Sequence, residues 1–82
     1  MYYVYILYSK KLDKKYIGST SDLKERIKIH NSERSEFTSK GIPWKLLYYE
    51  AFISEKDARI EEKFIKSGKG RERLKYLLQN SL

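Results

Sequence analysis

The chain has 82 residues, with 18 Lys and Arg against 11 Asp and Glu, and therefore a net charge of +7. We expect a chain of this length to form one domain, residues 1–82, with one compact core and a shallow site in place of a deep cavity. It contains no cysteine, which excludes a disulfide framework and a thiolate metal site.

The positive charge favours a polyanionic partner, and nucleic acid is the commonest polyanion that such a protein meets. The alternative is a basic surface that has no partner. No apolar run approaches the ~20 residues of a membrane span, and the N-terminus lacks the basic region of a signal peptide. We therefore expect a soluble, cytoplasmic protein with no membrane partner.

Two strands are predicted first, over residues 2–9 (YYVYILYS) and 15–20 (KYIGST), joined by the charged segment 10–14. Two such runs separated by a short polar segment are typical of a β-hairpin. Both sets of alternating side chains in the first run are largely apolar or aromatic, which indicates a strand covered on both faces.

A helix is predicted after the hairpin, in the segment SDLKERIKIHN, with residue 21 or 22 as its N-cap. Leu23 and Ile27 are four residues apart and mark its buried side. Arg26 and His30 fall on the same side or its edge, where a helix that served packing alone would carry aliphatic residues.

Residues 32–43 are predicted to form a loop because they are polar and contain Gly41 and Pro43. Its length suggests a binding role, although a plain surface connection is the alternative. We expect Phe37 to be tucked in as an anchor. Residues 44–52 (WKLLYYEAF) then predict a third strand.

The second predicted helix begins with Ser54 as its cap and stops at Gly68. A terminal helix follows within residues 69–82. Its leucines share one side: Leu74, Leu77 and Leu78.

The second helix carries a carboxylate on its apolar side. Ala58 and Ile65 define the buried side, and Glu62 lies between them, four residues after Ala58. Ile60 and Phe64 predict that the apolar face is wide. The predicted fold is α/β, of the α+β type, with a three-stranded, mostly antiparallel sheet flanked by three helices in the order β-β-α-β-α-α.

Two tyrosine-rich triplets carry a resemblance to a known family. Tyr3-Val4-Tyr5 and Tyr16-Ile17-Gly18 are separated by ten residues, and this arrangement resembles the paired signature of the GIY-YIG nuclease superfamily. Over nearly its whole length the chain is similar to the small single-domain members of that superfamily, which are related to the N-terminal catalytic domain of the repair nuclease subunit UvrC. Gly18 would let the chain turn without a side chain beside the substrate.

The resemblance implies a metal-dependent endonuclease with five site residues. Glu62 matches the glutamate that holds the divalent ion, Mg²⁺ or Mn²⁺, and Arg26 matches the arginine that pairs with phosphate oxygens. Tyr16 matches the proposed general base, Tyr5 a positioning or assisting residue, and His30 a base relay or phosphate contact. Taken singly, Glu62 would be interpreted as an ion-pair partner and the two tyrosines as core residues.

Two positions depart from the family pattern. Tyr3 stands where the first triplet usually opens with glycine, and Leu74 stands where an asparagine is common about a dozen residues after the glutamate. These departures keep two alternatives open: a nucleic-acid-binding module that does not cleave, and a catalytic subunit that is active only within a repair complex.

The expected substrate is DNA or RNA, with DNA favoured, and a protein partner could supply specificity. The basic residues predicted to contact the phosphate backbone are Lys24, Lys28, Arg34, Lys40, Lys66, Lys69, Arg71 and Arg73.

Overall fold

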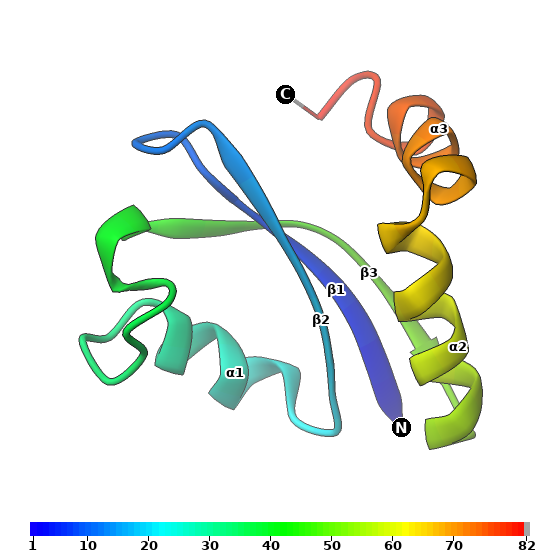
Figure 1. The fold of residues 1–82 in the computed structure, drawn as a ribbon. Coiled ribbons are helices and arrows are strands. Elements are labelled where there is room, and N and C mark those ends of the chain that lie inside the picture. Colours follow the sequence, from blue (N-terminus) through cyan, green and yellow to red (C-terminus); the bar gives the residue numbers. More distant parts are fainter. Residues whose placement is uncertain (82) are drawn as a thin grey trace.

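The computed structural model describes residues 1–81 and contains three strands and three α-helices in the predicted order, as Figure 1 shows. The elements are β1 (Tyr2–Ser9), β2 (Lys14–Thr20), α1 (Leu23–His30), the short 3₁₀ helix η1 (Ser39–Gly41), β3 (Trp44–Phe52), α2 (Glu55–Lys66) and α3 (Gly68–Leu77). The predicted α+β class and element order are confirmed. Within residues 1–81, no helix has both the length and the apolar character needed to cross a membrane.

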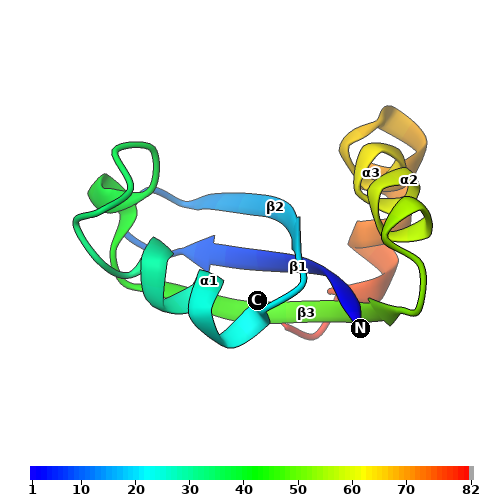
Figure 2. The same cartoon turned by 90° about the horizontal axis from the view of Figure 1, so that it is seen from below.

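The sheet has the order β2-β1-β3, and both pairings are antiparallel. Strand β1 is therefore central, and its residues Val4 to Leu7 have no exposed surface. Helix α1 lies on one side of the sheet and the α2–α3 pair on the other (Figures 1 and 2). This arrangement confirms that β1 is covered on both faces.

Each face of the sheet has its own apolar cluster. On the α1 side, Tyr5 and Leu7 pack with Trp44, and Leu23 and Ile27 of α1 lie against them. The cluster on the α2–α3 side contains Val4, Ile6, Ala58, Ile65, Leu74 and Leu78. The alternation of β1 thus divides the core into two parts with different neighbours.

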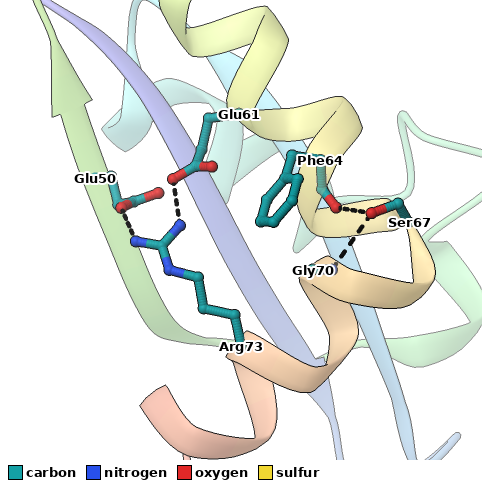
Figure 3. Close-up of polar contacts among 6 residues, drawn as sticks. All are labelled: Glu50, Glu61, Phe64, Ser67, Gly70 and Arg73. Atoms are coloured by element: carbon teal, nitrogen blue, oxygen red, sulfur yellow. Dashed lines mark hydrogen bonds and ion pairs between the residues drawn. The ribbon is translucent and has the colours of Figure 1, made fainter.

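The junction between α2 and α3 differs from the prediction. We expected Gly68 to stop the second helix, but α2 ends at Lys66 and Gly68 is the first residue of α3. Ser67 ends α2 and begins α3: its hydroxyl donates to the Phe64 carbonyl and accepts from the Gly70 amide, as Figure 3 shows. A Cβ at Gly70 would lie within 1.9 Å of that carbonyl oxygen, so only glycine fits there.

Helix α3 is tied to the sheet by Arg73 (Figure 3). Its guanidinium contacts Glu61 of α2 at 2.7 Å and Glu50 of β3 at 3.3 Å. Burial and the nearby Glu61 raise the pKa of Glu50, and hydrogen bonds from Glu50 and Arg73 outweigh burial and lower the pKa of Glu61. One arginine therefore connects three elements through two carboxylates of unequal acidity.

Two predictions about packing are wrong. Phe37 is 90% exposed, and the loop is anchored by its neighbour Thr38, whose side chain is buried and whose carbonyl accepts from the Trp44 indole at 2.7 Å. Ile60 and Phe64 are 58% and 40% exposed. The narrow sheet and α3 together cover only the Ala58–Ile65 stripe of α2, so its apolar face is not wide.

Candidate active site

A buried hydrogen-bonded chain lies between β1, α1 and the loop. The Tyr5 hydroxyl is 2.9 Å from Nε2 of His30, and Nδ1 of His30 is 3.1 Å from Oγ1 of Thr38. All three side chains are buried. With both ring nitrogens engaged, the imidazole is fixed in orientation, and a change of tautomer reverses the direction of both hydrogen bonds.

Thr38 was not among the residues that the sequence indicated. It lies in an irregular segment, eight residues after His30, and no local pattern connects the two. The same residue binds the Trp44 indole through its carbonyl. It therefore links the loop both to β3 and to the histidine.

Gly18 makes room for the Tyr5 ring. The two residues are cross-strand partners in β1 and β2. A Cβ built on Gly18 would lie 2.6 Å from the Tyr5 hydroxyl oxygen and 2.8 Å from its Cζ. Since Tyr5 is fully buried, its ring has little freedom to move away.

The protonation of Tyr5 and His30 is set by burial and by Arg26. Burial raises the pKa of Tyr5, as do the charges of Tyr16 and Glu62, while the guanidinium of Arg26 opposes the shift. Burial and the same guanidinium lower the pKa of His30 below its ordinary value. At neutral pH the chain therefore holds a neutral phenol against a neutral imidazole beside a fixed positive charge.

Tyr16 completes an aromatic group on the α1 side of the sheet. Its ring centroid lies 4.5 Å from that of His30 and 6.3 Å from that of Tyr5, with which it is stacked. Trp44 meets it edge-on at 6.4 Å. The Tyr16 ring is half-buried, so this tyrosine, unlike Tyr5, reaches the surface.

Arg26 borders a surface hollow of about 380 Å³ at the end of β2. Ser19, Thr20 and Ser21 line it together with Arg26, and so do Arg59 and Glu55 of α2, which form an ion pair at 3.2 Å. Within residues 1–81, Nε of Arg26 is buried and has no hydrogen-bond partner. The hollow thus combines hydroxyl groups and guanidinium groups, which are suited to an anionic group such as phosphate.

Glu62 reaches the same end of β2 from the other side of the sheet. Its Oε1 accepts a hydrogen bond from the Ser19 hydroxyl at 2.6 Å, and its Oε2 contacts Nζ of Lys66 at 2.7 Å. Burial acts to raise the pKa of Glu62, but the hydrogen bonds from Lys66 and Ser19 outweigh it and lower the pKa. Glu62 is therefore ionised at neutral pH.

The carboxylate oxygens of Glu62 are suitable ligands for a hard divalent ion. Within residues 1–81, no group of three His, Asp or Glu side chains converges to form a protein cage. Mg²⁺ does not require one, since it is commonly held by one or two carboxylates while water and substrate phosphate fill the remaining positions. The half-exposed ammonium of Lys66 contacts Oε2, so a positive charge already lies beside this oxygen.

The predicted site residues fall into two groups. Tyr5, Tyr16, Arg26 and His30 lie on the α1 side. Glu62 reaches the end of β2 from the α2 side, through its hydrogen bond with Ser19, which lines the same hollow as Arg26. Among the predicted phosphate contacts, Lys66 and Arg73 are already paired with carboxylates. Arg34 is also paired, with Glu25 at 3.8 Å, and all eight predicted contacts are exposed.

The chain matches a known protein family. Residues 1–75 match the family described as the GIY-YIG catalytic domain, and the chain belongs to that family. Its relatives are small proteins of the UPF0213 group.

One such relative, "UPF0213 protein in ldhD 5'region" of Pediococcus acidilactici, is 41% identical over 70 residues, which cover 82% of this chain and 71% of that protein. UPF0213 protein CPE1444 of Clostridium perfringens is 35% identical over 83 residues, covering all of this chain and 88% of that one. The solution structure of UPF0213 protein BH0048 from Bacillus halodurans has a TM-score of 0.57 and 36% identity, covering 94% of this chain and 85% of that one.

Proposed function

We propose that this chain is a metal-dependent endonuclease that hydrolyses phosphodiester bonds with a single divalent ion, Mg²⁺ or Mn²⁺, at Glu62. GIY-YIG domains are generally nucleases that act on nucleic acid. The observation that carries the proposal is that Ser19 fixes the ionised Glu62 at the end of β2, where Arg26 borders an adjacent hollow. An anionic substrate and a cation could be held side by side there.

Each residue of the proposed site has a distinct task. Arg26 binds the non-bridging oxygens of the phosphate, and its charge opposes the negative charge that develops in the transition state. Tyr16, at the surface beside the imidazole, acts as the phenolate: it accepts the proton of the attacking water and becomes the neutral phenol. Tyr5 and His30 form a buried hydrogen-bonded pair behind Tyr16 that can hold a proton. Thr38 fixes the orientation of the imidazole.

In this proposal Glu62 is the protein ligand of the metal ion, which when bound supplies charge neutralisation at the phosphate and the leaving oxygen. Ser19 holds Oε1 and so orients the carboxylate. Lys66 leaves Oε2 when the ion arrives, since one cation replaces another and the lysine is half-exposed. Such a partly exposed ion pair adds little stability, on the order of 0–1 kcal/mol, and is readily exchanged.

A non-catalytic nucleic-acid-binding module is the second candidate. The contact between Lys66 and Glu62 favours it, because a carboxylate committed to a lysine has no need of a metal ion. This alternative predicts that replacing Glu62 leaves both affinity and every measured activity unchanged.

The test is cleavage of labelled single-stranded, double-stranded and branched DNA and RNA with Mg²⁺, Mn²⁺ or EDTA. Glu62→Gln should abolish metal-supported cleavage and keep binding, since a neutral amide oxygen is a poor ligand for a hard dication. Arg26→Ala should slow cleavage on the order of 10²–10³-fold. Tyr16→Phe should slow it with little loss of stability, because the ring still packs against His30.

Glu33→Gln is the control, since Glu33 is exposed in the loop and forms no ion pair within residues 1–81. Thermal unfolding of all four variants separates a lost activity from a lost fold. Cleavage by Glu62→Gln at the parental rate would show that single-metal hydrolysis at Glu62 is wrong. The proposal also includes a cytoplasmic location, a single domain over residues 1–82, and a role in DNA repair. Of these, only the repair role rests on the likeness to UvrC.

A further inference from the structure

A second hollow, of about 640 Å³, lies between the start of β2 and helix α3. Its floor is apolar and is formed by Ile17 of β2 with Leu74 and Leu78 of the C-terminal segment. It lies on the α2–α3 side of the sheet, on the opposite face from Trp44. We call it the β2–α3 groove.

Four cationic side chains surround the β2–α3 groove. Lys14 and Lys15 come from β2, and Arg71 and Lys75 come from α3. Arg71 and Lys75 are one helical turn apart, about 6 Å along the axis, and so lie on one side of α3. Two elements that are distant in the sequence thus bring four positive charges to one groove.

These charges are poorly compensated. Within residues 1–81, Lys14, Lys15 and Arg71 form no ion pair, and Lys75 has only a 3.5 Å contact with the exposed Glu72. The one acidic residue of the groove, Asp13, accepts a hydrogen bond from the Tyr8 hydroxyl at 2.8 Å.

Several cations elsewhere on α2 and α3 are matched, whereas Lys56, Lys63 and Lys69 form no ion pair within residues 1–81. Arg73 contacts two carboxylates, Arg59 contacts Glu55 and Lys66 contacts Glu62. Most of the uncompensated positive charge of α3 and β2 therefore lies at the groove. An anionic polymer would neutralise it without displacing an existing ion pair.

We propose that the β2–α3 groove binds the sugar–phosphate backbone of the nucleic acid, on the same strand whose cleavage is proposed at Glu62. The choice of ligand rests on the proposed function. The four cations contact phosphates, and the apolar floor covers the sugars, so the contact does not depend on base sequence.

The path from the groove to Glu62 follows β2. This strand is at the edge of the sheet, and Lys15, Ile17 and Ser19 point to the same face. From Lys15 to Ser19, the hydrogen-bond partner of Glu62, there are four residues, or about 13 Å at roughly 3.3 Å per residue. Along one strand of a duplex, at about 3.4 Å per nucleotide, this separation corresponds to roughly four nucleotides between the groove and the proposed cleavage site.

The experiment measures binding of the full chain to a labelled 24-nucleotide single strand by fluorescence anisotropy, in EDTA and over a range of salt concentrations. The groove variant replaces four exposed residues by glutamine: Lys14, Lys15, Arg71 and Lys75. The control variant removes the same charge at four exposed lysines outside the groove: Lys10, Lys45, Lys56 and Lys63. The two half-variants, at residues 14 and 15 and at residues 71 and 75, keep the test valid if the fourfold change impairs folding.

Four lost phosphate contacts should lower the slope of log affinity against log salt by about 3, at roughly 0.7 per contact for a single strand. The control should change the slope much less. Equal slopes for the two variants would overturn the proposal. Groove-dependent binding of polyglutamate without groove-dependent binding of nucleic acid would also overturn it, and would identify an acidic protein as the partner.

Cleavage of substrates of different length separates this proposal from the proposed function. The groove variant should be impaired only on substrates that extend about four or more nucleotides from the cleaved bond. If the chain binds through the groove but never cleaves, the nuclease function is wrong and the groove stands. If Glu62→Gln abolishes cleavage while the groove and control variants bind alike, the groove is wrong and the nuclease function stands.

Discussion

Replacing Gly18 by alanine should disrupt the buried chain of Tyr5, His30 and Thr38 while touching none of these residues directly. The new Cβ would lie 2.6 Å from the Tyr5 hydroxyl oxygen, 2.8 Å from its Cζ and 3.1 Å from Cε1 of Tyr16. The two distances to Tyr5 are shorter than real Cβ contacts and the one to Tyr16 is tight, so the Tyr5 ring must shift. A shift of a few tenths of an ångström or more would lengthen the 2.9 Å contact with His30.

The magnitude follows from two contributions. Forcing one methyl group into a filled space costs about 1–3 kcal/mol. Leaving the hydroxyl and the imidazole without each other costs roughly 1–3 kcal/mol, because both are buried. Since one movement relieves part of the clash, we expect a total of about 2–4 kcal/mol. For a domain of this size that lowers the melting temperature by roughly 10–25 °C.

Calorimetry or circular dichroism of Gly18→Ala, measured beside Gly68→Ala, tests this reasoning. A Cβ at Gly68 meets nothing within 4 Å, so Gly68→Ala should change stability by less than about 0.5 kcal/mol. Adding Tyr5→Phe removes the oxygen at 2.6 Å and should restore part of the stability lost in Gly18→Ala, although Cζ at 2.8 Å remains. Gly18→Ala and Gly68→Ala melting at the same temperature would refute the close approach of Gly18 and Tyr5.

Two further changes have pH-dependent results. Because the pKa of His30 is lowered in the fold, the unfolded chain binds the proton first as pH falls below about 6.5. The stability that neutral His30 provides is therefore complete above that pH and is lost as pH falls toward the folded pKa. His30 is the only histidine, so urea unfolding of His30→Gln should lack this slope, and a slope kept by the variant would contradict the assignment. Arg73→Met should destabilise by roughly 1–3 kcal/mol at pH 7.5, since it leaves Glu50 facing Glu61. The loss of stability should be smaller at pH 5, because Glu50, whose pKa is already raised, takes up a proton there. Arg71→Met is the control. An equal loss of stability at both pH values would exclude repulsion between the carboxylates as the cause.

The sequence alone predicts the helices and strands, but it does not predict how the loop of residues 32–43 packs. Strand β3 has the predicted bounds, and Ser54 caps α2 as expected, because alternation and capping are local properties. Asp22, one of the two predicted caps, accepts from the Glu25 amide. By contrast, hydrophobicity predicts that Phe37 is buried and Thr38 exposed, and the structure shows the reverse. The buried residue at this position provides the hydroxyl group that pairs with His30. This pairing can be seen only in the folded structure, where α1 packs against the loop.

The candidate site was predicted in part for the same reason. The resemblance indicated Tyr5, Tyr16, Arg26, His30 and Glu62, but local spacing gave no signal for the residues that orient them. Ser19 fixes Glu62 from 43 positions away, and Thr38 fixes His30 from a loop. Serine and threonine are common surface residues, so their identity alone carries no prediction. Only the pairing of distant elements shows which of them are bound.

The alternation of side chains along β2 explains the order of residues in the triplet Tyr16-Ile17-Gly18. Alternate residues of a strand face opposite sides, so Tyr16 and Gly18 face α1 and the buried Tyr5–His30 pair, while Ile17 and Ser19 face α2. Ile17 packs in the core on the α2–α3 side, which fixes the register of the strand. A shift of one residue would turn Tyr16 away from His30 and would place Ser19 out of reach of Glu62. Because β2 is an edge strand, its two faces meet at an open border. Groups anchored on opposite sides of the sheet therefore meet at that border, and in the proposed function this is how Tyr16, Arg26 and Glu62 would reach one phosphate.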